Sequence, residues 1–350
     1  MLIMQGTELV LQQKIGSKLE NELKELLGAK VGNDDDHLFS LPSWLKEWKS
    51  PWTPKMNGGE LIPQGEKELY DLGIRTRKLF PDLFIHPYHS DIYTINATRV
   101  ARASASAVAF GMGLFNGSGS LGSDRHQAFS VVTESSAIDT MLRFFDCCHE
   151  YKVINYHAKF LIYNHDRSFF RSVHDFAMVG CFNLLEWTDD VEVFKLKGYG
   201  NSLNYRMGVH LLKDVVNSMD KAIDAKKENQ VPGTYEKARL RFSHAETLIP
   251  FTCLLGLFLE DEEVFRASPR PPATRNWKVS DVAPFAGNNM LVLYSCPLAN
   301  SSDEYFVRVL PNEKPIAMPD KIVAPHLKHD FHKLCTVNKE ESEVTLESSN

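Results

Sequence analysis

The stretch that most constrains this chain is residues 237–247, which read Lys-Ala-Arg-Leu-Arg-Phe-Ser-His-Ala-Glu-Thr. Leu240 and Phe242 alternate with arginines, a period of two that predicts a short strand. The apolar residues that follow recur at helical spacing, so His244 and Glu246 fall where a strand ends and a helix begins. In open α/β sheets ligands bind at such corners, and the helix N-terminus favours an anion.

Two titratable side chains at such a corner suit phosphate chemistry. His244 can donate hydrogen bonds to phosphoryl oxygens, and Glu246 can give a proton to a leaving alcohol. The alternative is structural: a histidine satisfied by backbone at a buried strand end, and a glutamate that balances the positive end of a helix. The local pattern alone leaves both interpretations open, because short motifs also match by accident.

A second corner of the same kind lies earlier in the chain. Residues 91–98 alternate in a way that predicts a strand, and Ala103–Leu114 has the small residues of a closely packed helix. Arg102 stands between them, although it could instead be a salt-bridged surface residue. Because both corners follow strands, we expect Arg102 and His244 to converge on one pocket.

Composition narrows the class of protein and of partner. The 350 residues are 43% hydrophobic and 24% charged, which is typical of a globular chain of one large domain or two. A net charge of -6 argues against a nucleic-acid partner and leaves a small polyanion to be bound by local basic residues. Without a long apolar run or a signal-peptide layout, we expect no transmembrane segment and no signal peptide. The six cysteines lack the spacing of metal ligands. Asn96, Asn116 and Asn300 begin glycosylation sequons, but sequons also occur by chance in a chain of this length and do not by themselves indicate a secreted protein.

The other segments predict an α/β sheet that carries an inserted, mainly helical cap. We expect helices over Leu9–Leu27, Pro63–Phe80, Ser135–His149 and most of Asp189–Lys227, an extended cover over Pro42–Trp52, strands over Ala128–Thr133 and Leu291–Tyr294, and a hairpin of Tyr305–Leu310 with Pro315–Met318. We assign residues 1–125 and 236–335 to the two parts of the α/β domain, 126–235 to the cap and 336–350 to a disordered tail.

Several stretches together resemble the histidine acid phosphatases, specifically the plant branch of the multiple inositol polyphosphate phosphatases, which act as phytases. They are Gly59–Gly65, Ala97–Phe110, Glu186–Asp190 with Lys197–Gly200, Ser243–Thr247 and Ala283–Tyr294. The resemblance covers most of residues 40–335. It implies a phosphoglycerate-mutase-like, doubly wound sheet with a helical cap. It also implies phosphomonoesterase activity on inositol polyphosphates and bisphosphoglycerate, and a location in the secretory pathway (endoplasmic reticulum, extracellular or membrane-associated).

The resemblance also implies roles for single residues. Arg102 would clamp the phosphate, with Lys197 as a further substrate-binding residue. His244 would line the phosphate pocket, and Glu246 would donate the proton to the leaving group. The phosphoryl group would pass to a histidine and then to water, with no metal or other cofactor. Arginines suit such a site because their fork matches phosphate oxygens.

One part of the family pattern is absent. The family's nucleophile lies in an N-terminal Arg-His-Gly-x-Arg-x-Pro motif, which does not occur in the 350 residues, and Arg125-His126 reads as a surface pair. The missing segment would also supply two arginines and the central first strand of the sheet, so we expect that strand to be absent. We expect no turnover without the nucleophile. The alternatives to an enzyme are a non-catalytic polyanion-binding protein and a degenerate family member that does not fold.

Overall fold

The structure, a computed structural model, describes residues 2–5, 59–157, 178–267, 271–296 and 304–316. The expected helix at Leu9–Leu27, the expected cover at Pro42–Trp52 and the expected tail at 336–350 lie outside these ranges.

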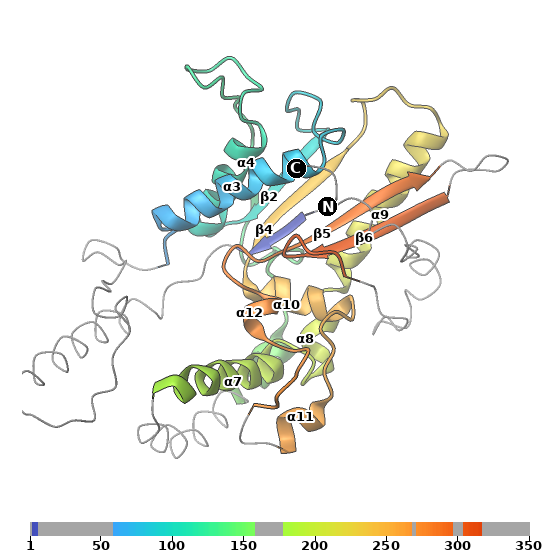
Figure 1. Cartoon of the computed structure of the whole chain (residues 1–350). Coiled ribbons are helices and arrows are strands. Elements are labelled where there is room, and N and C mark those ends of the chain that lie inside the picture. Colours follow the sequence, from blue (N-terminus) through green and yellow to red (C-terminus); the bar gives the residue numbers. More distant parts are fainter. Residues whose placement is uncertain (1, 6–58, 158–177, 268–270, 297–303, 317–350) are drawn as a thin grey trace, which may run out of the picture.

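A mixed sheet forms the centre of the described structure, with the strand order β3-β2-β4-β1-β5-β6 (Figure 1). The strands are β1 (Leu2–Gln5), β2 (Tyr93–Thr98), β3 (Val132–Glu134), β4 (Ala238–Ser243), β5 (Asn288–Cys296) and β6 (Glu304–Pro311). β3, β2, β4 and β1 pair in parallel, whereas β5 is antiparallel to both β1 and β6. The carboxyl ends of the four parallel strands therefore share one edge of the sheet.

The alternation in β4 separates the two faces of the sheet. Leu240 and Phe242 are buried against α3 (Pro63–Leu79) and α4 (Ala101–Leu114). Arg239 and Arg241 turn to the other face, where both pair with Asp214 of α9 (Val209–Lys227). Burial lowers the pKa of Arg241 to about 10, so the Asp214 carboxylate is needed to hold this charge inside the fold.

Helices α3 and α4 cross closely because glycines stand at the contact. A methyl group added at Gly73 would overlap the carbonyl oxygen of Phe110, and one added at Gly113 would overlap that of Tyr70. Phe110 in turn packs on Phe242 of β4, with 5.6 Å between ring centroids. The small-residue pattern of the sequence thus brings α4, whose first turn carries Arg102, against the sheet.

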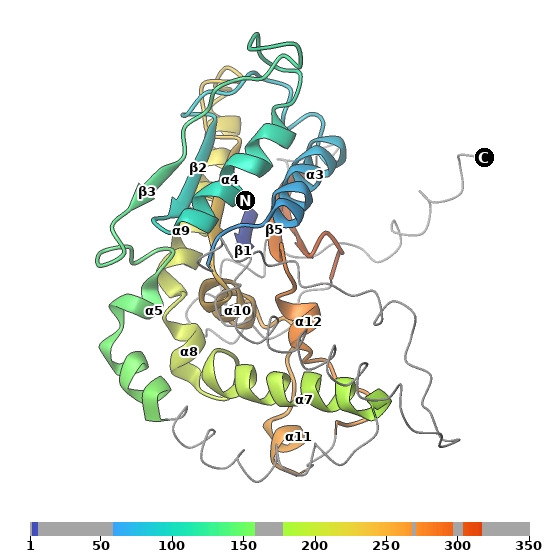
Figure 2. The same cartoon turned by 90° about the vertical axis from the view of Figure 1, so that its left-hand side faces the viewer.

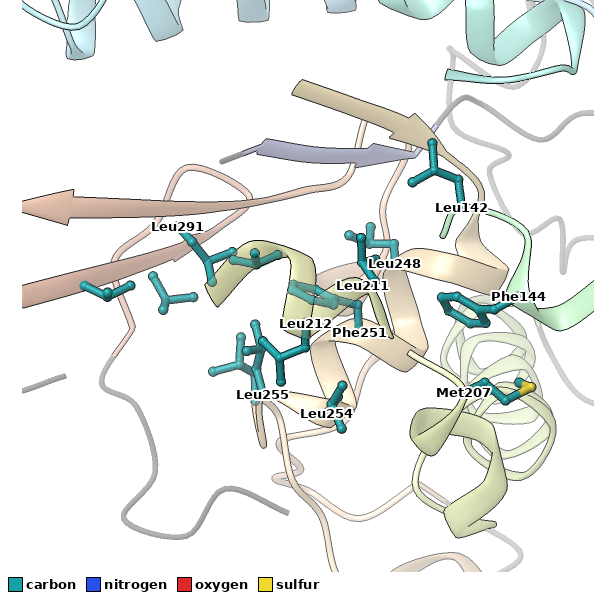
Figure 3. Close-up of a cluster of buried hydrophobic side chains, with 14 of the residues drawn as sticks. Leu142, Phe144, Met207, Leu211, Leu212, Leu248, Phe251, Leu254, Leu255 and Leu291 are labelled. Carbon is teal, nitrogen blue, oxygen red and sulfur yellow. The ribbon is translucent and has the colours of Figure 1, made fainter. Parts of the chain in front are cut away.

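Figure 3 shows the core on the opposite face. Leucines of α9 meet α10 (Ala245–Leu254) and strand β5 in one buried cluster, which Leu142 and Phe144 extend toward the carboxyl edge. The residues of α10 are buried on nearly every side. Its N-terminus, and therefore His244 and Glu246, is consequently fixed by packing.

The remaining helices gather beyond one end of the sheet (Figures 1 and 2). They are α5 (Phe144–Cys147), α7 (Met178–Leu196), α8 (Ser202–Arg206), α11 (Glu262–Ala267) and α12 (Val279–Val282). The domain boundaries at residues 126–235 and 236–335 remain a prediction. Two contacts cross them: α9, from the first range, packs on the sheet, and Trp277, from the second, packs on Phe194 of α7. None of the described helices is long and apolar enough to cross a membrane.

The expected helix over Ser135–His149 is wrong for most of its length. Within that range Phe144–Cys147 is helical, and His149 begins a second helical stretch over residues 149–157. The carboxylate of Asp139 accepts a hydrogen bond from the backbone N–H of Leu142, and the hydroxyls of Ser243 and Thr247 donate to the carbonyl of Leu142. These side-chain bonds satisfy backbone groups that a helix would have used.

The expected absence of the central strand is also wrong. β1 lies between β4 and β5, with Gln5 opposite Ser243 in the parallel register. Near the edges, β3 begins at Val132 and so covers only part of the expected strand at Ala128–Thr133. β6 pairs along its length with β5, and an isolated bridge from Val309 to Ile316 marks the expected hairpin within the described residues, which end at Ile316.

Candidate functional site

The two corners identified in the sequence meet at the carboxyl edge of the sheet. β2 ends at Thr98 and α4 begins at Ala101, while β4 ends at Ser243 and α10 begins at Ala245. β2 and β4 are parallel neighbours, so their two following helices begin at the same edge of the sheet. His244 occupies the extended position just before α10, with φ −128° and ψ 169°.

The imidazole of His244 lies at the centre of the site. It is 2% exposed, and its Nε2 is 2.9 Å from the Thr98 hydroxyl. Arg143 Nη1 is 3.2 Å from the same nitrogen, and Arg102 Nη2 is 3.3 Å from Nδ1. The expectation that Arg102 and His244 converge on one pocket is therefore confirmed.

Burial and positive charge keep this imidazole neutral. Burial is the largest cause that lowers the pKa of His244, from 6.5 to about 4, and the nearby charges of Arg102 and Arg143 lower it further. Glu246 and Asp146 act in the opposite direction without overcoming these effects. At a pH near 5 the ring is therefore mostly neutral and able to share a hydrogen bond without adding a charge.

Glu246 and Lys197 form the second pair of the site. Lys197 Nζ lies 2.8 Å from Glu246 Oε1, and each side chain is 21% exposed. Burial alone would raise the pKa of Glu246, but the Lys197 ammonium and the backbone N–H of Glu246 outweigh it and hold the pKa below its usual value. The carboxylate is therefore ionised until something draws Lys197 away.

The loop after α7 fixes Lys197 at the pocket. Asn204 donates to the carbonyls of Lys195 and Gly198, and Tyr151 donates to that of Leu196. At Gly198 an added methyl group would overlap the indole of Trp277. The Lys-Gly-Tyr-Gly pattern is thus a tight turn against α8 that presents the lysine.

The Glu186–Asp190 stretch of α7 holds neighbouring segments of the fold together. Asp190 is fully buried, accepts a 2.8 Å hydrogen bond from Arg275 Nε, and accepts one from the backbone N–H of Val279. Glu186 pairs with the same arginine, whose guanidinium lies over the Trp187 ring. These contacts fasten the segment before α12 to α7 and assign this motif a structural part.

A pocket of about 380 Å³ contains the four residues identified from the sequence. It is lined by Arg102, Arg143, Phe145, Asp146, Tyr151, Lys152, Asn155, Tyr156, Lys197, His244 and Glu246. Four of these side chains are basic and two are acidic, so the lining is net positive in a chain whose net charge is -6. Such a pocket favours an anion.

Sequence reasoning missed Arg143, Asp146 and the face of residues 149–157. Arg143 stands in the segment expected to be a continuous helix, where one arginine among apolar residues carries no signal. Its position at His244 comes from the hydrogen bonds that tie the neighbouring carbonyl of Leu142 to Ser243 and Thr247. By contrast, Arg125 and His126 lie in the turn after α4, outside this lining.

Strand β1 ends beside this pocket. In register, Gln5 stands opposite Ser243, the residue before His244. The sequence through and after β1 reads Leu-Ile-Met-Gln-Gly-Thr-Glu over residues 2–8 and contains no histidine. The strand is present, but the sequence there does not carry the Arg-His-Gly motif.

Comparisons with known proteins agree with this geometry. The family described as histidine phosphatase superfamily (branch 2) matches residues 12–167 and 140–312. Among related sequences, multiple inositol polyphosphate phosphatase 1 of Homo sapiens is 25% identical over 334 residues, covering 82% of this chain and 66% of that protein. The Dictyostelium discoideum protein of the same name is 26% identical over 370 residues, covering 79% and 57%. The chain thus spans less than two thirds of the length of either relative.

Solved structures show the same fold. The phytase from D. castellii superimposes with a TM-score of 0.59 at 15% identity, over 91% of this chain and 73% of that one. A multiple inositol polyphosphate phosphatase from Bifidobacterium longum in complex with inositol hexasulfate gives a TM-score of 0.51 at 16% identity, over 75% of each chain.

The sheet with its helices and the family match lead to one conclusion. This chain belongs to branch 2 of the histidine phosphatase superfamily, as the resemblance implied.

Proposed function

We propose that the chain is of the inositol polyphosphate phosphatase type, a class of phosphoric monoester hydrolases, and that the ester phosphate of such a substrate binds in the pocket around His244. The observation that carries this is the convergence of Arg102, His244, Glu246 and Lys197 on one net-positive pocket. Relatives named multiple inositol polyphosphate phosphatase support the substrate class. The assignment to the plant branch stays a prediction.

The pocket residues have complementary parts in such a reaction. Arg102 and neutral His244 would hold phosphoryl oxygens, and the guanidinium fork would stabilise charge that develops on them. A second phosphate of the substrate would draw Lys197 from Glu246, and the pKa of the carboxyl group would then rise. As the phosphoryl group passes to a nucleophile, which the family resemblance implies is a histidine, the P–O bond to the alcohol breaks and protonated Glu246 would give its proton to the leaving alkoxide.

A second candidate function is non-catalytic binding of the same polyanions. It is favoured by one observation: the sequence holds no Arg-His-Gly motif, and β1 ends at Gln5. Among the described residues that line the pocket, His244 is the one imidazole, and both of its ring nitrogens already face side-chain donors. For the 350 residues as they stand we therefore expect binding without turnover.

Calorimetry and phosphate release at about pH 5 separate these cases, since an acidic pH favours the protonated form of a carboxyl group that acts as a general acid. Inositol hexakisphosphate should bind, and unphosphorylated inositol should not. Arg102→Gln should weaken binding. Arg75→Gln should not, because Arg75 is an exposed arginine that pairs with Glu313 outside the pocket lining. Release of phosphate would establish a phosphatase, whereas binding without release would establish a non-catalytic polyanion-binding protein. No binding of inositol hexakisphosphate would reject both.

The secretory location remains part of the proposal. Of the described sequons, Asn116 is exposed after α4, whereas Asn96 is half-buried within β2. Of these two sites we expect Asn116 to carry a glycan. Glycosidase treatment of the protein from its natural source should reduce its mass, and an Asn116→Gln variant should show a smaller shift than the parent.

A further inference from the structure

Arg143 approaches the pocket from a direction different from that of Arg102. Its Nη1 is 3.2 Å from Nε2 of His244, whereas Arg102 Nη2 is 3.3 Å from Nδ1. The two guanidinium groups thus flank one buried imidazole on opposite ring nitrogens. No feature of the sequence pattern assigns a part to Arg143.

The guanidinium of Arg143 is held in place before any ligand arrives. Asp146 accepts hydrogen bonds from its Nε, at 2.7 Å, and from its Nη2. Its Cζ also lies 5.3 Å from the centroid of the Phe145 ring, and the side chain is only 17% exposed. Because Asp146 takes one side of the fork, the remaining Nη1 is directed toward His244.

The imidazole cannot satisfy both arginines. A neutral ring accepts a hydrogen bond at only one of its nitrogens, and the other carries the proton. The hydroxyl of Thr98, 2.9 Å from Nε2, can accept that proton or compete for the same lone pair. Two cations that converge on one neutral acceptor are better satisfied by an anion with several oxygens, such as a phosphoryl group.

We propose that Arg143 is a second phosphate-binding arginine, oriented by Asp146, which grips the same phosphoryl group as Arg102 from the opposite side. This inference rests on the proposed function, and it assigns the phosphate two guanidinium ligands within this chain. Asp146 is then a positioning residue, because it acts through Arg143.

Inorganic phosphate is the probe, titrated by calorimetry into the full chain and four variants. Arg143→Gln should weaken phosphate binding about tenfold or more, as expected for loss of a charge-assisted hydrogen bond. Arg143→Lys should lose less because it keeps the charge, and Asp146→Asn should lose less because it keeps the arginine. Arg75→Gln, which removes an arginine–carboxylate pair outside the pocket, should bind as the parent does.

A second readout excludes a merely structural role. The charges that face His244 are Arg102, Arg143, Glu246 and Asp146. Arg143→Gln removes one of the two cations, so the pKa of His244, followed by NMR of labelled histidine, should rise above its value of about 4. Arg75→Gln should leave it unchanged.

The outcomes distinguish this inference from the proposed function. Phosphate affinity within twofold of the parent in a folded Arg143→Gln chain, or no phosphate binding by the parent, would overturn the inference. Inositol hexakisphosphate that binds no better than inorganic phosphate, while both depend on Arg143, would refute the proposed substrate class and leave the phosphate clamp intact.

Discussion

The buried histidine should make the fold sensitive to acid in a defined way. The pKa of His244 is about 4 in the folded chain, against 6.5 for an unburied histidine. Because the folded-state pKa is the lower one, the unfolded chain takes up the proton first as pH falls. The stabilisation by the neutral ring is therefore complete above about pH 6.5 and is lost as pH falls toward 4.

The magnitude follows from the two pKa values. The gap between 6.5 and about 4 corresponds to roughly 3 kcal/mol of unfolding free energy, at about 1.4 kcal/mol for each pKa unit. Between about pH 7 and pH 4.5 most of this, roughly 2 kcal/mol, should be lost. The His244→Asn variant cannot take up this proton. Between these two pH values its unfolding free energy should therefore fall by that much less than the unfolding free energy of the parent.

Urea unfolding at several pH values, followed by circular dichroism, measures this difference. Carboxylates remote from His244 that titrate over the same range contribute to both chains and cancel in the comparison. His210→Asn is the matched control, because His210 is exposed on α9. If the parent and His244→Asn lost stability in parallel, His244 would not be the buried, cation-flanked ring described here.

Three further predictions follow from other parts of the structure. Because β1 already lies beside β4, replacing Met4, Gln5 and Glu8 by Arg, His and Arg should restore turnover of inositol hexakisphosphate. Glu246→Gln should then remove most of the gain, roughly 100-fold or more for a lost general acid, and turnover that survives this change would contradict the donor role. Lys197→Met should raise the pKa of Glu246, measured by NMR of labelled glutamate, and an unchanged pKa would disprove the importance of the ion pair. Gly113→Ala should destabilise the fold by roughly 1–3 kcal/mol through its overlap with the Tyr70 carbonyl. Met112 is exposed on the same helix, so Met112→Ala should change the unfolding free energy, measured with urea, by less than about 0.5 kcal/mol. Equal losses of unfolding free energy in the two variants would refute the close crossing of α3 and α4.

The corners of the fold could be predicted because their residues carry strong local patterns. Leu240 and Phe242 alternate with arginines that pair on the opposite face, and the apolar residues of α10 recur at helical spacing. Parallel pairing of β2 and β4 then made the meeting of Arg102 and His244 a geometric consequence. The position of Lys197 came from the family resemblance alone, and its pairing with Glu246 came only from the structure.

The rest of the site depends on contacts that no local pattern encodes. Arg143 reaches His244 because hydroxyls more than 100 residues away bind the carbonyl of Leu142 and stop a helix from forming. β1 is only four residues long, and without a neighbouring turn signal Leu2–Gln5 gives no basis for placing it between β4 and β5. Tertiary hydrogen bonds and strand pairing override local propensity at both places.

A crystal structure of the chain with inositol hexasulfate would show whether the pocket around His244 binds the polyanion. We predict one sulfate group between Arg102 and Arg143, within hydrogen-bond distance of both, with its ester oxygen toward Glu246 and with Lys197 drawn to a second sulfate. The structure offers a competing location, a larger cavity of about 650 Å³ lined by Lys226, Lys237 and Arg239 along with apolar residues of α9 and β5. A ligand seated there, with the pocket around His244 empty, would show that Arg102, Arg143 and His244 do not form the binding site.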